Sequence, residues 1–412
     1  MRILAIETSC DDTGVAILEV KNNKFKVLSN IISSQEIHKN YGGVFPMMAK
    51  REHQNNLVSV LAKALNQVKL LKVKRGLENS KLKNIEKILE KENKLFLNLK
   101  TFLEKYKKPE VDLIAVTNGP GLEPCLWVGV NFAKALSYFW DIPTVPVNHI
   151  EAHILVNFID LNSKFKNQNA KLQSKIKNLL PAICLVVSGG HTQLVFMEKI
   201  GDYKIIGETR DDAAGECFDK CAKILGLGYP GGPIISKIAS QSVQRQSLGG
   251  LPRPMINSKD YDFSFSGLKT AVLYKVRDKK ECPSSSNSSG HSALRASGSM
   301  RRDFVSEMCF EIQQAIIDVL IKKTINAARN YKVKTIILGG GVSANSELRS
   351  QFEMQNSKIK NQNDNSKFKI IYPPKNLSTD NALMIAITAF FHKNKKVQWQ
   401  KLKAKANLRI GQ

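Results

Sequence analysis

The fold is predicted from a pattern whose first copy is Ile3-Leu-Ala-Ile-Glu-Thr-Ser-Cys-Asp-Asp-Thr-Gly-Val-Ala-Ile17. An apolar strand runs into a small polar turn and then into a second apolar strand, which predicts a β-hairpin. The stretch Ile183-Cys-Leu-Val-Val-Ser-Gly-Gly-His-Thr-Gln-Leu-Val-Phe196 repeats this plan. Two such hairpins, each with a phosphate-sized turn, suggest two similar lobes that face each other across a cleft. The alternative is a chance similarity of two hairpins.

Outside a few unusual segments, short apolar strands alternate with helical patterns along the chain. This alternation is typical of an α/β protein with mixed sheets. We therefore expect duplicated mixed-sheet lobes with a cleft between them. The predicted N-terminal lobe covers 1–160, with a helical insertion at about 66–108, and a C-terminal helix at about 382–412 returns to it. The predicted C-terminal lobe covers 181–381, with low-complexity insertions at about 279–300 and 355–369. A linker at 161–180 joins the two lobes.

The inserted segments differ in character. Apolar residues recur at helical spacing among lysines and glutamates over 77–107, which predicts an amphipathic helix or a helical hairpin. The segments 162–169 and 356–363 echo each other and are rich in Asn, Gln and Lys. We interpret both as loop expansions, and the Ser-rich stretch 282–300 as a further, disordered loop.

The chain has a formal net charge of +26, with 62 Lys and Arg against 36 Asp and Glu. Most of this excess lies in the segments 66–108, 162–178, 356–369 and 393–405. It favours a polyanionic partner such as nucleic acid without locating a site, and expanded solvated insertions are the alternative. No apolar run is long enough to span a membrane, no signal peptide is recognisable, and the seven cysteines show no framework spacing. We expect a cytoplasmic protein without a membrane partner.

Three glycine-rich turns follow apolar strands, at Asn118–Gly121, Val187–Gly190 and Gly339–Asn345. Glycines at such turns let backbone N–H groups approach a phosphate, and a following helix N-terminus adds positive potential. None of the three is a Walker A loop or a dinucleotide fingerprint. Each alone is more often an ordinary tight turn, but three in one chain favour a nucleotide-binding cleft.

His149 and His153 follow the apolar strand at 141–147 and lie four residues apart. Four residues make about one helical turn, so both imidazoles point the same way and are able to hold one metal ion. The alternative is two surface histidines on an ordinary helix. Glu151 gives the order His-x-Glu-x-His, whereas a zinc peptidase places its glutamate directly after the first histidine. One position on a helix is a rotation of about 100°, so a metallopeptidase is disfavoured.

Acidic residues precede two predicted helices. Asp211 and Asp212 stand where one helix begins, and N-capping is the simplest interpretation of them. Asp380 precedes the apolar helix 382–391, where it is either a cap or a third metal ligand. Spacing alone favours the cap.

Taken together, the motifs resemble those of the bacterial TsaD-type (Gcp) tRNA N6-adenosine threonylcarbamoyltransferases. They occur in family order over nearly the whole chain, which makes the combination far more specific than any single turn. The matching stretches are Ile6–Asp11, Tyr41–Val44, Val116–Leu122, Asn148–His153, Val187–Gln193, Asp211–Lys220, Gly228–Pro233, Asp262–Lys269, Gly340–Asn345 and Thr379–Asn381.

The resemblance implies an actin-like, sugar-kinase-like (ASKHA) two-lobed fold and an acyltransferase activity. The threonylcarbamoyl group of threonylcarbamoyl-AMP would pass to the exocyclic amine of the adenosine 3′ of the anticodon, in tRNAs that read A-starting codons. The implied partners are tRNA, a TsaB-like protein and a TsaE-like protein. A separate enzyme would supply the adenylate.

The resemblance also implies site residues. His149, His153 and Asp380 would hold one divalent metal ion per subunit, with iron(II) expected first and zinc as the alternative. The implied substrate-binding positions are Val186, Val187, Ser188, Gly189, Gly190, Asp219, Gly232 and Asn345, with Ser9, Asp11, Asp12, His191 and Ser236 as further candidates.

Four positions depart from the usual family pattern. Asp12 replaces a glutamate, Met47 replaces a carboxylate expected in the cleft, Pro124 stiffens a turn, and Ser236 stands where many members have an aspartate. These changes suggest retuned activity rather than its loss, because all implied metal positions are present.

Two rival functions remain at this point. An ATP-dependent kinase or ATPase of the same fold explains the hairpins and glycine turns, but it leaves the histidine pair and Asp262–Lys269 without a role. A non-catalytic scaffold lobe like TsaB predicts missing metal ligands and a shortened second half, and the sequence has neither feature.

Overall fold

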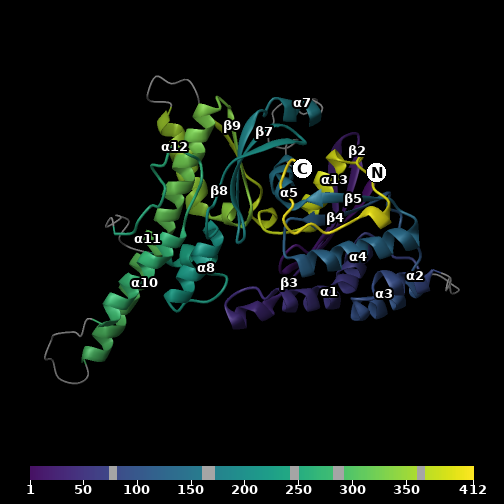
Figure 1. The fold of residues 1–412 in the computed structure, drawn as a ribbon, viewed down its shortest axis with the longest axis horizontal. Coiled ribbons are helices and arrows are strands. Elements are labelled where there is room, and N and C mark those ends of the chain that lie inside the picture. Colours follow the sequence, from purple (N-terminus) through teal and green to yellow (C-terminus); the bar gives the residue numbers. More distant parts are fainter. Residues whose placement is uncertain (74–80, 160–171, 242–249, 282–291, 360–366) are drawn as a thin grey trace.

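Two five-stranded mixed sheets form the frame of the computed structural model (Figure 1). The structure describes residues 1–73, 81–159, 172–241, 250–281, 292–359 and 367–412. The first sheet has the order β3-β2-β1-β4-β5. Its strands are β1 (Arg2–Glu7), β2 (Asp12–Lys21), β3 (Lys24–Ser34), β4 (Leu113–Gly119) and β5 (Thr144–Asn148).

The second sheet repeats this topology. Its order is β10-β9-β6-β7-β8, and its strands are β6 (Ala182–Val187), β7 (Thr192–Lys199), β8 (Asp202–Glu208), β9 (Thr335–Gly339) and β10 (Lys369–Ile371). In each sheet the first three strands form an antiparallel meander, and the last two run parallel to the first strand. The shared connectivity confirms the predicted duplication and the two-lobed ASKHA architecture.

The central strands of both sheets are buried on both faces, as their apolar runs require, whereas the edge strands β3 and β8 are partly exposed. In β1, Ile3 and Ala5 face the core between the two sheets, whereas Leu4 and Ile6 face the outer core of the first lobe. In β6 the alternation is the same, with Ala182, Cys184 and Val186 turned to the central core. Both hairpins therefore lie at the centre of the molecule, and their turns reach the same cleft.

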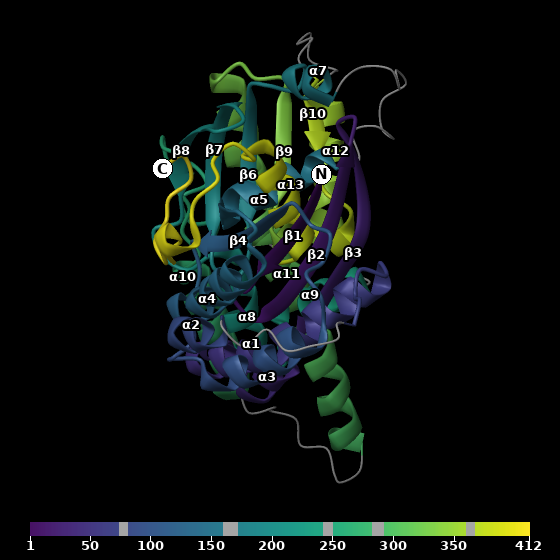
Figure 2. The same ribbon diagram turned by 90° about the vertical axis from the view of Figure 1, so that its right-hand side faces the viewer.

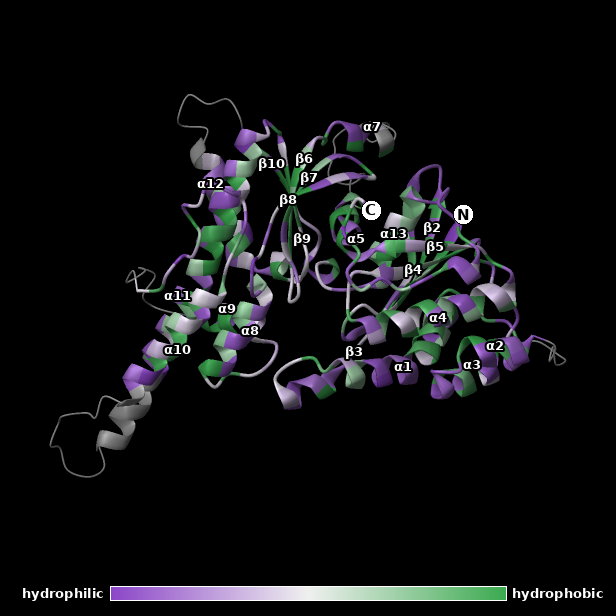
Figure 3. Cartoon of the chain, viewed as in Figure 1, coloured by the Kyte–Doolittle hydropathy of each residue, from purple (hydrophilic) through white to green (hydrophobic). Residues whose placement is uncertain are grey.

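Two helices fill the space between the sheets (Figures 1 and 2). They are α5 (His149–Leu155) and α13 (Ala382–Phe391), and both belong to the central core. Figure 3 shows α13 as almost wholly hydrophobic, which agrees with its burial on all sides. Because α13 comes from the far end of the chain, the residues just before it are brought beside α5.

Outer helices cover the remaining faces. α1 (Pro46–Gln67) and α4 (Glu123–Trp140) pack on the first sheet, and α2 (Leu82–Ile88) and α3 (Asn93–Lys105) pack on them. The predicted helical hairpin is therefore present, with residues 74–80 outside the described part. The second sheet is covered by α11 (Ser292–Asn330), with α8 (Ala214–Ile224), α9 (Gly231–Ser240), α10 (Ser266–Glu281) and α12 (Ser346–Ile359) around it.

Several inserted or terminal segments differ from expectation. The last helix ends at Phe391 instead of running to the C-terminus, because the Lys393–Lys396 stretch has no apolar face to bury. The predicted loop 282–300 is helical from Ser292 onward, where α11 begins. Its first residues, 282–291, lie outside the described part.

The two Asn/Lys-rich segments also contain ordered structure. The linker 161–180 ends in the short helix α7 (Leu172–Lys177), whose Leu172 and Ile176 are buried in the central core. The segment 355–369 contributes the last turn of α12 and the start of β10. Residues 160–171 and 360–366, which carry most of both repeats, lie outside the described residues. Among the helices described, none is long and apolar enough to cross a membrane.

Candidate metal centre and substrate cleft

A cleft of about 1570 Å³ lies between the two lobes and takes its walls from both. The first lobe contributes the β1–β2 turn and Gly42–Val44, and the second contributes α8, α9 and the turn after β9. All three glycine-rich turns of the sequence reach this cleft, through Pro120–Gly121, Ser188–Gly190 and Gly341–Asn345. A Cβ atom on Gly189 or Gly190 would meet nothing within 4 Å, so this backbone is open to a ligand. The glycine turns thus form one cleft.

The helix α5 begins directly at the end of β5, and Asn148 sets its start. The Asn148 side-chain oxygen accepts hydrogen bonds from the backbone N–H groups of Ile150 (2.9 Å) and Glu151 (3.1 Å). This N-cap satisfies two donors that a helix start otherwise leaves unpaired. The first residue of the helix is His149, and His153 follows one turn later on the same side.

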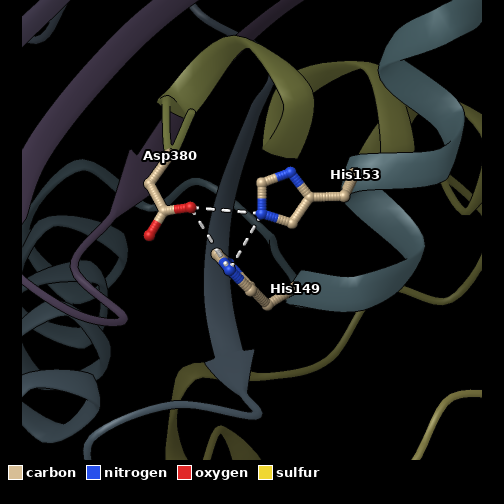
Figure 4. A group of neighbouring side chains, drawn as sticks. All are labelled: His149, His153 and Asp380. Carbon is tan, nitrogen blue, oxygen red and sulfur yellow. Dashed lines mark hydrogen bonds and ion pairs between the residues drawn. The ribbon is translucent and has the colours of Figure 1, made fainter. Parts of the chain in front are cut away.

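Asp380 completes a group of three with the two histidines (Figure 4). Asp380 Oδ1 lies 3.1 Å from His153 Nε2 and 3.5 Å from His149 Nε2, and the two Nε2 atoms are 3.2 Å apart. The expected cap role of Asp380 is wrong, because the side chain of Asn381 accepts the N–H of Met384 at the start of α13. Asp380 is thereby free to face α5.

Glu7, at the end of β1, is the residue of this centre that the sequence analysis did not single out. Its side chain is fully buried, and Oε2 lies 3.2 Å from His149 Nδ1. The same oxygen accepts a hydrogen bond from the Thr117 hydroxyl at 2.6 Å, and Ser9 Oγ lies 3.2 Å from His149 Nδ1. A glutamate at the end of an otherwise apolar strand is a signal that was available in the sequence.

The carboxylates of Glu7 and Asp380 stabilise positive charge on the histidines between them. Burial alone would lower the pKa of His149, but Asp380 and Glu7 outweigh burial and raise this pKa to about 9. Burial alone would raise the pKa of Glu7 and of Asp380, yet the charge of His149 lowers both. Burial also lowers the pKa of His153, whose ring lies beside His149. A cation at the meeting point of Asp380 and the two Nε2 atoms satisfies all of these groups at once.

The geometry fits a transition-metal ion. Nitrogen and oxygen ligands about 2.1 Å from one ion lie roughly 3.0–3.4 Å from each other in octahedral or tetrahedral arrangements, close to the three distances observed. Because Glu7 is ionised, His149 Nδ1 carries the proton that it faces, and the lone pair of Nε2 is left for a metal. Such a carboxylate–histidine pair is the usual support of a metal-ligating imidazole. Three protein ligands leave further positions for substrate oxygens.

Glu151 points away from this centre, as its register predicts. Its Oε1 accepts hydrogen bonds from the Tyr203 hydroxyl and from His392 Nε2, both at 2.7 Å. Tyr203 belongs to β8 and His392 follows α13, so Glu151 ties α5 to both neighbouring elements. It is not placed to act as the general base of a metallopeptidase.

Most of the other candidate residues line the same cleft. They are Ser9, Asp11, Asp12, Ser188, Gly189, Gly190, His191, Asp219, Gly232, Ser236 and Asn345. Val186 and Val187 do not, because both side chains are fully buried within β6. Only the backbone of these two residues is available to a ligand.

Several cleft residues have perturbed acidity. Burial, reinforced by Asp380, raises the pKa of Asp11, and burial together with nearby carboxylates raises that of Asp12 to about 7. Burial raises the pKa of Asp219 to about 6, although its carboxylate accepts the Gly231 N–H at 2.7 Å. Burial, followed by the charges of His149 and His153, lowers the pKa of His191 to about 4. Perturbed groups gathered in one cleft are typical of a functional site.

The expected N-capping by Asp211 or Asp212 is wrong. The N-cap of α8 is Ala213, which has no side-chain cap. Asp211 instead accepts hydrogen bonds from the hydroxyls and backbone N–H groups around Ser264 and Ser266, at the start of α10. Asp212 pairs with Lys220. Asp211 thus joins the start of α8 to the start of α10, whereas the pairing of Asp212 with Lys220 of α8 is local.

Arg349 of α12 connects two walls of the cleft. Its Nε donates to the carbonyl of Ser343 (2.6 Å), in the turn after β9. Its Nη2 donates to the carbonyl of Pro373 (2.9 Å) and to Ser378 Oγ (3.0 Å), in the segment that leads to Asp380. One guanidinium therefore holds both the glycine-rich turn and the approach to the metal centre.

Two departures from the family pattern are harmless to the local fold. Pro124 lies in the first turn of α4, where a proline removes no helical hydrogen bond. Met47 is 67% exposed and lines a smaller neighbouring pocket with Pro124 and Trp127, outside the main cleft. The expectation that Met47 removes a carboxylate from the main cleft is therefore not supported, because position 47 is not among the residues that line this cleft.

Comparison with a family model and comparison with individual relatives point to the same family. Residues 26–74 and 98–387 match the family model for tRNA N6-adenosine threonylcarbamoyltransferase. A protein of that name from Thermomicrobium roseum is 39% identical over 95% of this chain and 92% of its own length. Others from Syntrophomonas wolfei and Porphyromonas gingivalis are 38% and 37% identical, over 95% and 94% of this chain and 92% of their own lengths. The stretch 75–97 that the family model leaves unmatched contains α2 and the start of α3.

Among solved structures, a hexokinase of the ROK group from Thermus thermophilus aligns with 96% of this chain and 99% of its own, at 9% identity and a TM-score of 0.42. YeaZ from Pseudomonas aeruginosa aligns with 50% of this chain and 65% of its own, at 12% identity and a TM-score of 0.26.

Proposed function

The chain belongs to the tRNA N6-adenosine threonylcarbamoyltransferase family, and on that premise we propose that it modifies the adenosine 3′ of the anticodon in tRNAs that read A-starting codons. The donor is threonylcarbamoyl-AMP, and the product is N6-threonylcarbamoyladenosine. The observation that carries the proposal is the convergence of His149, His153 and Asp380 in the cleft that the three glycine-rich turns line.

The donor is a mixed anhydride, and the acceptor is a weakly nucleophilic aromatic amine. A divalent metal held by the three residues would hold donor oxygens and polarise the carbonyl that the amine attacks. Iron(II) is our first choice for this ion and zinc the second, because two imidazoles and one carboxylate suit both. Since AMP is a good leaving group, no nucleophilic serine or cysteine is required.

The side chains of this protein contribute positioning and proton handling. In this proposal the open backbone at Gly189 and Gly190 offers N–H donors to the phosphate of the donor, and Asp219, which lines the same cleft, accepts its ribose hydroxyls. The attacking amine must lose a proton. Asp12 lines the cleft and has a pKa raised to about 7, so in this proposal it accepts that proton at neutral pH. Positioning and electrostatics supply most of the rate enhancement.

We further propose that the protein acts in the cytoplasm with a TsaB-like and a TsaE-like partner. The predicted lobe boundaries at 160 and 181 remain part of this proposal, with the chain after 382 returning to the first lobe. The kinase and peptidase alternatives gain no support from the centre: Glu151 is engaged elsewhere, and a kinase has no use for the triad.

The test is reconstitution. Purified protein with metal, the two partners, threonylcarbamoyl-AMP and unmodified tRNA should yield the modified nucleoside, detected by mass spectrometry of digested tRNA. His149→Ala and Asp380→Ala should lose transfer by at least about a hundredfold and should lose bound metal, measured by elemental analysis. Undiminished transfer by His149→Ala would overturn the metal assignment. ATP consumption without tRNA modification would favour the kinase alternative.

A further inference from the structure

The segment between β3 and α1 exposes an unusual amount of apolar surface. Tyr41 is 52% exposed, Phe45 48% and Ile37 37%, and Met47, in the first turn of α1, is 67% exposed. The rings of Tyr41 and Phe45 meet edge to face, with centroids 5.5 Å apart. Such an arrangement leaves ring faces available to another aromatic group. The fold does not need this exposure, so it points to a ligand.

This segment lies at the mouth of the cleft. Gly42, Gly43 and Val44, between the two aromatic residues, line the cleft. A Cβ atom on Gly42 or Gly43 would meet no other atom within 4 Å, so the backbone between the rings borders open space. Figure 1 shows the start of α1 on the side of the first lobe that faces α8. The aromatic pair therefore forms one rim of the substrate cleft.

Two lysines form the opposite rim. Lys223 of α8 and Lys237 of α9 line the same cleft, are exposed, and form no ion pair with any other described residue. By contrast, Lys220 is held by Asp212 and Glu216. Two uncompensated cations across from an aromatic pair form a surface that suits a flexible anion with flat rings.

We propose that this rim binds the unpaired nucleotides of the anticodon loop that flank the target adenosine. Bases stack on Tyr41 and Phe45, while Lys223 and Lys237 bind loop phosphates. Aromatic stacking with a cationic groove is the common means of binding single-stranded nucleic acid. The inference rests on the proposed function, because an adenosine whose amine reaches the triad leaves its neighbours at the rim.

A protein partner is the competing occupant of the aromatic patch. Apolar contacts with a protein would account for Tyr41, Phe45 and Met47. They would not account for two unpaired lysines on the other wall of a cleft that has to admit RNA. The charge of the facing wall therefore favours the nucleic acid.

The experiment compares two double variants in the reconstituted transfer reaction and in direct tRNA binding. Tyr41→Ala with Phe45→Ala should weaken tRNA binding and raise the KM for tRNA about tenfold or more at every salt concentration, because stacking depends little on salt. Lys223→Ala with Lys237→Ala should weaken binding most at low salt and reduce the salt slope by about one. The KM for the donor should stay unchanged in both.

Matched controls separate the loss of these specific RNA contacts from the loss of any exposed aromatic ring or lysine. Tyr274→Ala removes another exposed aromatic ring, on α10 and outside the cleft lining. Lys24→Ala with Lys26→Ala removes two exposed lysines of β3. Both controls should bind tRNA like the parent. Tyr41→Phe with Phe45→Tyr keeps both rings and should restore binding.

Unchanged tRNA binding in the Tyr41/Phe45 variant overturns the inference while leaving the proposed function intact, provided that the parent protein modifies tRNA. Loss of TsaB-like partner binding with intact tRNA binding assigns the patch to protein and also overturns it. Failure of the parent to modify tRNA at all is a failure of the proposed function itself.

Discussion

The Nδ1 atom of His149 lies 3.2 Å from the buried carboxylate of Glu7, so the other ring nitrogen is the one turned to His153 and Asp380. The carboxylate thus selects the tautomer and fixes the ring plane of a residue placed as a metal ligand. It also stabilises the positive charge that the centre demands.

Glu7→Gln should lower metal affinity by about tenfold to a hundredfold without unfolding the protein, because the amide no longer selects the His149 tautomer. Competition with a chelator measures this directly, independent of catalysis. Glu19→Gln is the matched control, since Glu19 is another buried glutamate of the first sheet, paired with Arg2 instead of a cleft residue. Metal binding as tight as in the parent would show that Glu7 has no such role.

Glu151→Gln should keep transfer activity within about tenfold of the parent and cost stability of about 1–3 kcal/mol, because one of the two hydrogen bonds to Tyr203 and His392 is lost or weakened. Urea unfolding and steady-state transfer measure the two effects. A metallopeptidase general base would behave in the opposite way. Metal-dependent peptide cleavage that disappears in this variant would therefore revive the peptidase interpretation.

Arg349→Lys should impair both the donor and the metal site, because lysine keeps the charge but does not reproduce the three directed hydrogen bonds. We expect a KM for threonylcarbamoyl-AMP raised about tenfold and a severalfold weaker metal affinity, with unchanged circular dichroism. Arg210→Lys, at an exposed ion pair with Asp260 and Asp262, is the control. If the donor KM and the metal affinity equal those of the parent, Arg349 has no role in either site beyond stabilising the fold.

Asp12→Asn should make the metal-free protein more stable than the parent above pH 7. Burial raises the pKa of Asp12 to about 7 in the folded protein, against about 3.9 in the unfolded chain. Between these two pKa values the folded state holds the extra proton, so this carboxyl costs increasing stability as the pH rises from about 4 to about 7, and the cost is constant at higher pH. The advantage of the variant should shrink as the pH falls and vanish near pH 4.

Urea midpoints at pH 5 and pH 8, in the presence of a chelator, measure this difference. Asp278→Asn, which removes an exposed carboxylate of α10, should show no such trend. An advantage of Asp12→Asn that is equal at both pH values would contradict the assigned acidity.

Local patterns in the sequence were sufficient to predict features that depend only on residues within one hairpin or one helix. The hairpins at 3–17 and 183–196 were predicted from strand, turn and strand, because side-chain alternation and turn chemistry act between near neighbours. The common direction of His149 and His153, and the diverging direction of Glu151, follow from helix geometry alone. The family resemblance added Asp380 to this pair.

Sequence patterns alone were thus enough for the duplicated α/β plan, the three glycine-rich turns and the orientation of the histidine pair. Three other features became visible only in the folded molecule: Asn381, not Asp380, caps α13, Glu7 supports His149, and Arg349 joins two walls of the cleft. The difference lies in the sequence distance over which each interaction acts. Periodicity and capping act over one or two turns, whereas these contacts join residues that come together only when α5 and α13 pack between the two sheets.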